Sequence, residues 1–436
     1  MSHHQQRSPS RREFLKVSAA GLSVAACALP VARSAHAAGS DTLKIGLIGC
    51  GGRGAGAAAN AMNADANSKL VAVTDIFEDK LQKGLQSLKG MKPEQVAVDA
   101  DHCFVGFDGY EKVIASDVDV VVIACASRFH PKYLKAAIDA NKHVFVEKPH
   151  AIDPPGIHTV IAACEQAKQK GLSVVSGLCW RYDRGVQETM KRLHDGAIGD
   201  VVAIQETYMR TPYHTNETKK GDWSETEYQF RNWYHFSWLS GDDIAQSLIH
   251  SMDKGAWLMR DEPPVVAYGQ GGRASLNERV YGNVFDHFSI MYEYANGVRM
   301  YAIGRAQSNC HNDVSDIFLG TKGRCNLLKN EIAGETNWKY AGPKPPSMYD
   351  EEHVALFQAI RSGTPVNNGT YMVRSSMLAI LGQMVAYTGQ QIAWDDAMKA
   401  TYTLGPDECD FQTPPPVEPD ENGTYPVPMP GFHKMG

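Results

Sequence analysis

The fold of this chain is decided by the stretch Leu43-Lys44-Ile45-Gly46-Leu47-Ile48-Gly49-Cys50-Gly51-Gly52-Arg53-Gly54. Its first half predicts a short apolar strand, and a small-residue helix is expected to follow over Ala55–Met62. The glycines have the Gly-x-Gly-x-x-Gly spacing of a dinucleotide-binding turn. Gly49 permits a tight turn, Gly51 lets the backbone approach a pyrophosphate, and Gly54 lets the helix pack on the strand. Free amides at the helix start would face the phosphates.

A second strand is predicted over Leu70–Thr74, and it ends at Asp75, 21 residues after Gly54. An acidic residue at this distance is typical of ribose recognition. Its carboxylate would repel a 2′-phosphate, so the sequence favours NAD over NADP. The alternative is a glycine-rich turn that binds no ligand.

The first half of the chain alternates between apolar strands and helices. Each strand is apolar throughout, which is typical of a parallel sheet covered on both faces. The further strands are expected at 118–124, 143–146 and 172–176, and helices at 131–140 and 156–170. The pattern predicts a Rossmann dinucleotide-binding domain over residues 38–178.

The pattern changes near Arg181. Residues alternate between apolar and polar over 201–208 and 286–294, and Asn296-Gly297 predicts a tight hairpin into 298–303. Amphipathic helices are expected at 351–362 and 375–389. We therefore predict a second α+β domain over residues 179–405, with a mostly antiparallel open sheet and helices on one face. Residues 406–436 contain eight prolines and should run extended over the surface.

The chain begins with an apparent export signal over residues 1–37. Ser10-Arg11-Arg12-Glu13-Phe14-Leu15-Lys16 resembles a twin-arginine motif, and Ala35-His36-Ala37 a cleavage site. The stretch ending at Cys27 also resembles a lipoprotein box, which leaves membrane anchoring open. The signal predicts a periplasmic protein. No later apolar run has the length of a membrane span.

Composition excludes some partners. Residues 1–37 hold five basic residues and one acidic residue, so removing them lowers the net charge from −6 to −10. This acidic balance argues against nucleic acid. The remaining eight cysteines include no Cys-x-x-Cys pair, so no metal site is expected.

Several motifs resemble those of the Gfo/Idh/MocA family, which is named after glucose–fructose oxidoreductase, inositol dehydrogenase and rhizopine catabolism. They are the glycine turn with Asp75, the run His130 through Glu147-Lys148-Pro149, residues 177–182 and residues 241–253. The resemblance covers most of residues 42–400. It implies a Rossmann domain, an open-sheet domain that often mediates homo-oligomers, a cis peptide before Pro149, and sugars or cyclitols as substrates.

The resemblance also implies roles for individual residues. Lys148, at the carboxyl edge of the sheet, would donate a hydrogen bond to the substrate oxygen, and His250 would accept the hydroxyl proton. The family's aspartate four residues before the histidine is Gln246 here, which would still hydrogen-bond the substrate but cannot act as a base. Asp253 would orient His250 or bind a hydroxyl, while Asp242 suggests a helix cap. The expected cofactor-binding set is Gly49, Gly51, Gly52, Arg53, Gly54, Asp75, Ser127, His130, Glu147, Lys148 and Arg181.

Each catalytic assignment has an alternative. Lys148 could be an ordinary surface lysine, and His250 could be an interior histidine whose ring nitrogens are hydrogen-bonded within the core. Residues 223–238 contain seven aromatic residues, including Trp233 and Tyr234. These form either a sugar-stacking wall, with Arg210, Tyr213 and His214 at its rim, or a packed loop or subunit contact. His353 is interpreted as structural.

The leading functional hypothesis is an NAD-dependent oxidoreductase that acts on a sugar, cyclitol or derivative. An exported enzyme has no soluble cofactor pool, so it would recycle a tightly bound dinucleotide in place. One alternative is redox-neutral glycoside hydrolysis by oxidation, elimination, hydration and reduction. A second is a non-catalytic dinucleotide-binding protein.

Overall fold

The computed structural model describes residues 42–213, 217–406 and 408–435. The predicted signal and His214 lie outside these residues, so the predictions made for them stay predictions. The described residues belong to one compact unit. None of its helices is long and apolar enough to cross a membrane.

The first sheet is parallel and six-stranded, with the order β3-β2-β1-β4-β5-β6. Its strands are β1 (Leu43–Ile48), β2 (Ser68–Asp75), β3 (Cys103–Val105), β4 (Val120–Ile123), β5 (His143–Val146) and β6 (Val174–Ser176). Leu43, Ile45 and Leu47 are fully buried, as are all four residues of β4. Burial on both faces explains why these strands read as apolar runs. The predicted Rossmann sheet is confirmed.

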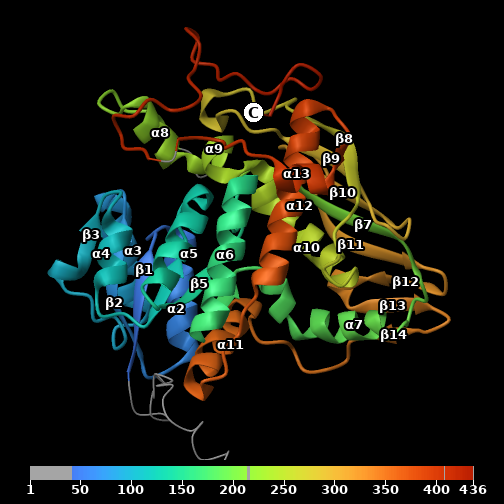
Figure 1. The fold of residues 1–436 in the computed structure, drawn as a ribbon, viewed down its shortest axis with the longest axis horizontal. Coiled ribbons are helices and arrows are strands. Elements are labelled where there is room, and N and C mark those ends of the chain that lie inside the picture. Colours follow the sequence, from blue (N-terminus) through green and yellow to red (C-terminus); the bar gives the residue numbers. More distant parts are fainter. Residues whose placement is uncertain (1–41, 214–216, 407, 436) are drawn as a thin grey trace, which may run out of the picture. The chain divides into compact units, whose positions relative to one another are not determined.

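Helices flank this sheet (Figure 1). They are α2 (Gly52–Ala64), α3 (Glu78–Met91), α4 (Gly109–Ala115), α5 (His130–Asp139) and α6 (Pro154–Lys170). Asp153 caps α6 by accepting a hydrogen bond from Gly156 N, and Gly171 ends the helix with φ +68°. The predicted α2, α5 and α6 are confirmed to within a few residues.

The second sheet has nine strands in the order β14-β13-β12-β11-β7-β10-β9-β8-β15, and only β7 and β10 pair in parallel. Its strands are β7 (Val201–Arg210), β8 (Val266–Gly272), β9 (His287–Glu293), β10 (Arg299–Ala306), β11 (Asp313–Gly320), β12 (Gly323–Asn326), β13 (Glu331–Gly334), β14 (Trp338–Lys339) and β15 (Ile392–Ala393). Gly297, with φ +83°, lies in the predicted hairpin between β9 and β10. The mostly antiparallel sheet is confirmed.

The helices of the second half are α7 (Arg184–His194), α8 (Glu225–Arg231), α9 (Ser237–Ser240), α10 (Ile249–Leu258), α11 (Met348–Ser362), α12 (Gly369–Thr388) and α13 (Trp394–Lys399). Helix α10 packs on β7, and α12 packs on β8 (Figure 1). Helix α11 does not follow the domain boundary that the sequence predicted, which placed it in the second domain. Its Leu356, Phe357 and Ile360 join the core beside β1 and α2, so a late segment completes the dinucleotide half.

The Pro-rich tail has no helix or strand in its described part, residues 406 and 408–435. It is held by specific contacts. Phe411 stacks on Phe77, Gln229 Nε2 donates a 2.7 Å hydrogen bond to Val417 O, and Thr226 Oγ1 donates one to Thr413 O. The tail therefore fastens α8 to the rest of the molecule.

Candidate functional site

The glycine turn connects β1 to α2, and its glycines differ in what surrounds them. Gly49 has φ +95°, and a Cβ there would lie 2.6 Å from Ala124 O. A Cβ on Gly54 would lie 1.8 Å from Gly49 O, so α2 reaches the strand only because this side chain is absent. Gly51 and Gly52 face open space, with nothing within 4 Å of a Cβ. The turn thus leaves room above the start of α2.

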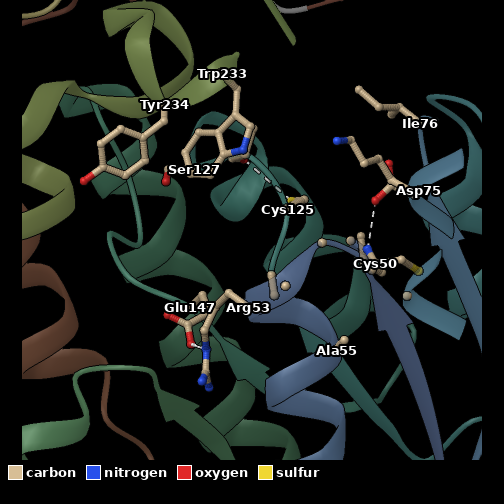
Figure 2. A pocket seen from close by; sticks show the side chains of 18 of the residues that line it. Cys50, Arg53, Ala55, Asp75, Ile76, Cys125, Ser127, Glu147, Trp233 and Tyr234 are labelled. Carbon is tan, nitrogen blue, oxygen red and sulfur yellow. Dashed lines mark hydrogen bonds and ion pairs between the residues drawn. The ribbon is translucent and has the colours of Figure 1, made fainter. Parts of the chain in front are cut away.

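Asp75 ends β2 beside this turn (Figure 2). Its carboxylate accepts hydrogen bonds from Cys50 N at 2.8 Å and from Phe77 N at 3.0 Å. Burial raises the pKa of Asp75, whereas the two backbone amides oppose that shift. These bonds fix the carboxylate at the edge of the space above the turn.

A cleft of about 1180 Å³ runs from this turn to helix α10. It brings together most of the residues that the sequence singled out. Those lining it are Gly49, Gly51, Gly52, Arg53, Asp75, Ser127, His130, Glu147, Lys148, Trp233, Tyr234, Gln246 and His250. Gly54 does not line the cleft; it lies where α2 packs against the end of β1.

Lys148 follows β5 and precedes Pro149 through a cis peptide bond, as predicted. Its ammonium donates a 2.6 Å hydrogen bond to the backbone oxygen of Gln246. Burial lowers the pKa of Lys148, and Glu147 partly offsets this. The side chain therefore reaches from the parallel sheet to the segment that carries His250.

His250 lies on α10, directly after a π-helical segment over Ile244–Leu248. Its Nδ1 is buried and has no hydrogen-bond partner among the described residues. Burial, and then the positive charges of Lys148 and Lys254, lower the pKa of His250 well below its usual range. This shift favours the neutral form of the imidazole, which has a ring nitrogen that can accept a proton.

Gln246 does not present a free amide to the cleft. Its Nε2 donates to Ser127 Oγ at 2.9 Å and also to Ser240 O. The backbone oxygen of the same residue holds Lys148. Gln246 therefore organises the wall and joins the π-helical segment before α10 to the turn that precedes α5.

Two further side chains, Arg53 and His130, each hold two partners in the rest of the wall. Arg53 Nε donates to Glu147 Oε1, while Nη2 of the same arginine lies 3.6 Å from Glu352. The His130 ring nitrogens lie 2.7 Å from Pro149 O and 3.1 Å from Cys125 O. Figure 2 shows Arg53 and Glu147 on the side of the pocket opposite Trp233 and Tyr234.

Three assignments are corrected by the structure. Arg181 and Asp253 do not line the cleft. They form a buried ion pair with an N–O distance of 2.9 Å, and Arg181 also pairs with Asp261. Asp242 is not the N-cap of the helical segment that follows, which is Asp243; it has φ +70°, and its carboxylate accepts hydrogen bonds from Asp243 N and also from Phe285 N and the Tyr387 hydroxyl. These partners come from distant segments, so spacing along the sequence could not reveal them.

The aromatic run divides between the two roles considered for it. Trp233, Tyr234 and Phe230 line the cleft, whereas Tyr228, Phe236 and Trp238 pack in a buried cluster with Tyr425 of the tail. Tyr213 lies at the rim, with the Arg210 guanidinium 3.6 Å from its ring centroid. Arg210 itself pairs with Asp243. His353 is fully buried against Phe145, which supports a structural role.

The sequence did not reveal several cleft residues. Phe77, Phe107 and Lys80 lie toward the Asp75 end, while Tyr208 lies beside His250 and Tyr349 beside Arg53. Only Tyr208 carried a signal, because it is the last residue of a strand predicted to alternate. Phe77 and Phe107 come from loops, Lys80 from the start of α3 and Tyr349 from α11, and their positions depend on the tertiary fold.

Comparison with known proteins gives matches along most of the chain. Residues 43–176 match a family model described as an oxidoreductase family, NAD-binding Rossmann fold, and residues 190–371 match its C-terminal alpha/beta domain. Inositol 2-dehydrogenase of Klebsiella pneumoniae (strain 342) is 28% identical over 51% of this chain and 56% of its own length. That of Pseudomonas fluorescens (strain SBW25) is 29% identical over 74% of this chain and 87% of its own length. The chain spans little more than half the length of most such relatives.

Solved structures show the same fold. Aldose–aldose oxidoreductase from Caulobacter crescentus has a TM-score of 0.62 and 19% identity, covering 81% of this chain and 99% of its own. A levoglucosan dehydrogenase in complex with NADH has a TM-score of 0.64 and 16% identity over the same shares.

Proposed function

The chain belongs to the Gfo/Idh/MocA oxidoreductase family, and we propose that it is an NAD-dependent oxidoreductase of a sugar, cyclitol or derivative. The observation that carries this proposal is the position of two groups in one cleft with the glycine turn. These groups are the Lys148 ammonium and the His250 imidazole, whose Nδ1 lacks a partner. A neutral imidazole beside an ammonium is suited to removing a hydroxyl proton.

The residues of the cleft fit a dinucleotide. The turn is open above Gly51 and Gly52, where a pyrophosphate would approach the amides at the start of α2. Asp75 lies where the adenine ribose would be bound, and its carboxylate disfavours NADP. Phe77 and Phe107 offer apolar surface beyond it.

The catalytic groups act on the substrate hydroxyl. His250 accepts its proton, and Lys148 donates a hydrogen bond to the same oxygen, which stabilises the charge that develops there. Gln246 holds Lys148 in reach through its backbone oxygen. A nicotinamide held in this cleft would supply the chemistry of accepting the hydride and returning it.

Neutral polyols suit the substrate end of the cleft. Trp233 and Tyr234 provide aromatic faces on which the C–H groups of a sugar ring can pack. The proteins with similar sequence or fold are named for inositol, aldose or levoglucosan, which are uncharged and rich in hydroxyls. We assign the same substrate class to this chain.

We further propose that the dinucleotide is retained between turnovers and that the chain is exported by its twin-arginine signal. The segment 217–238 spans the Asp75 end of the cleft. Its Glu217 pairs with Lys80, and Arg231 pairs with Asp79 at 3.2 Å. Phe411 of the tail packs against Phe77, Phe107 and Phe230, which all line the cleft. These contacts oppose release of the cofactor.

Homo-oligomer formation is a further part of the proposal. Tyr301 and Leu319 are 37% and 41% exposed on the outer face of β10 and β11, away from the helices. Apolar residues on such a face suit burial against a second copy.

The test uses the purified chain without added cofactor. We expect a bound nicotinamide that myo-inositol, levoglucosan or an aldose reduces, as seen by absorbance. An aryl glycoside that releases phenol without net NADH would instead assign redox-neutral hydrolysis. A bound nicotinamide that no polyol or glycoside changes would assign a non-catalytic binding protein.

A further inference from the structure

Three ionisable side chains meet in the core behind the catalytic helix. Lys254 follows His250 by one turn on α10, and Glu206 and Asp316 lie opposite each other on β7 and β11. All three residues have 0% exposure. Lys254 Nζ lies 3.1 Å from Asp316 Oδ2 and donates a 2.7 Å hydrogen bond to the backbone oxygen of His250. We call these three residues the buried charge cluster.

The packing around the buried charge cluster is close. A Cβ on Gly255 would lie 2.6 Å from Glu206 Oε1, so the helix reaches the strand only because glycine stands there. The ring of Trp180 covers the ammonium, with its centroid 5.0 Å from Nζ. An ammonium at this depth must be balanced by charge, because water cannot reach it.

The charges balance if one carboxyl group holds a proton. Apart from the Lys254–Asp316 ion pair, no other residue donates to the carboxyl oxygens of Glu206 and Asp316 in the described part of the chain, and the two carboxyl groups are close enough to share a hydrogen bond with each other. Burial, and then the neighbouring Asp316, raise the pKa of Glu206 well above its usual range. Glu206 is therefore the protonated partner, and the cluster contains one ammonium, one carboxylate and one neutral carboxyl group.

We propose that Lys254 is a positioning residue for His250, with Asp316 and Glu206 as its proton-sharing counter-charge. Its ammonium holds the backbone carbonyl of His250 and places a positive charge beneath the imidazole. That charge favours the neutral ring, which is the form that accepts a proton. This inference rests on the proposed function only where it names His250 as the base.

Other groups also face the two sites. Lys148 from the end of β5, Arg53 from α2 and Tyr208 from β7 lie around His250. Asp253 of α10 and Tyr294, which follows β9, influence Glu206 and its surroundings. Replacing Lys254 removes none of these side chains, so a shift at His250 reports the lost ammonium and the response of its two carboxyl partners.

The experiment follows the His250 imidazole by NMR in the full chain with its retained dinucleotide, using histidine-labelled protein and His250→Gln for assignment. In Lys254→Met, the titration midpoint of His250 should rise by about one pH unit, the order of shift that a nearby charge produces. Lys191→Met is the matched control: this lysine is 72% exposed on α7, and its loss should leave the midpoint unchanged. A midpoint that is the same in Lys254→Met and wild type overturns the proposal.

Two further variants keep the test decisive. If Lys254→Met does not fold, Lys254→Met with Asp316→Asn removes both charges, and the midpoint should still rise, by less, because the lost ammonium is the nearer of the two groups to His250. Glu206→Gln replaces a neutral group by a neutral group, so its thermal midpoint should stay near wild type, whereas Asp316→Asn should lower it by leaving the ammonium unpaired. A larger loss of thermal midpoint in Glu206→Gln than in Asp316→Asn would contradict the assignment of the proton to Glu206. Because NMR needs no turnover, absence of polyol oxidation would count against the proposed function alone.

Discussion

The two ends of the cleft are built on opposite principles. At the dinucleotide end, glycines remove side chains, and Asp75 is tied to two backbone amides. At the catalytic end, ionisable side chains are buried: His250 Nδ1 has no partner, and the pKa values of His250 and Lys148 are both lowered by burial. Binding thus depends on backbone shape, whereas catalysis depends on charges held away from water. Substitutions at the dinucleotide end should therefore lower stability or cofactor binding, whereas substitutions at the catalytic end should lower turnover.

Replacing Lys148 by alanine should have the largest effect. Loss of the hydrogen bond to the developing oxyanion should lower kcat about 10³-fold, the order found when such a donor is removed. The bound nicotinamide and the thermal midpoint should stay close to wild type. Lys135→Ala, an exposed lysine on α5, is the control. Equal turnover in wild type and Lys148→Ala would refute the role.

Replacing His250 by glutamine should lower kcat/KM about 10²-fold, because the hydroxyl proton then has no base. The pH profile gives a second readout. The lowered pKa of His250 keeps the ring unprotonated below pH 6.5, so wild-type kcat/KM should stay flat as the pH falls past that value and decline only at lower pH. His250→Gln should lose this acid limb, while His311→Gln, on the surface, should keep it. A wild-type decline centred above pH 6.5 would contradict the assignment.

Substitutions at the dinucleotide end should act through the packing of the glycine turn, and two glycines there should respond differently. Gly54→Ala places a Cβ 1.8 Å from Gly49 O and should cost about 3 kcal/mol of unfolding free energy, as overpacking does. Gly51→Ala meets nothing within 4 Å, so its stability without cofactor should change by less than about 0.5 kcal/mol. Its NAD binding should still weaken, because that space belongs to the pyrophosphate. Urea unfolding and NAD titration of both variants check this, and equal stability losses would break the comparison.

The smallest effect is expected at the tail. Phe411→Ala removes the ring that packs against three residues of the cleft, so bound nicotinamide should leave about tenfold faster, as the loss of one aromatic contact implies. Phe432 lies in the same tail and is 82% exposed, which makes Phe432→Ala the matched control. Release is measured by dilution into a NAD-scavenging enzyme. Identical release rates in the two variants would show that the tail does not retain the cofactor.

The same contrast explains how far the sequence could predict the molecule. Glycine spacing and apolar runs are local signals, so the parallel sheet, the turn and Asp75 were predictable from them, whereas the cis peptide at Pro149 was expected from the family resemblance. The places of Lys148 and His250 came from resemblance. Partners between distant segments were not predictable: Arg181 with Asp253 and Asp261, and the packing of α11 on α2. Such contacts are set by how the two sheets meet, and the linear sequence carries no period for them.

The central claim is that a retained nicotinamide reacts in a cleft shared by Lys148 and His250. Single-turnover absorbance tests it most directly: wild type and Lys148→Ala are purified without added NAD and mixed with the polyol that wild type oxidises. We predict that both proteins carry nicotinamide, and that only wild type develops reduced-nicotinamide absorbance, up to one equivalent per chain. Equal rates in the two proteins, or a wild type that carries no nicotinamide, would contradict the account.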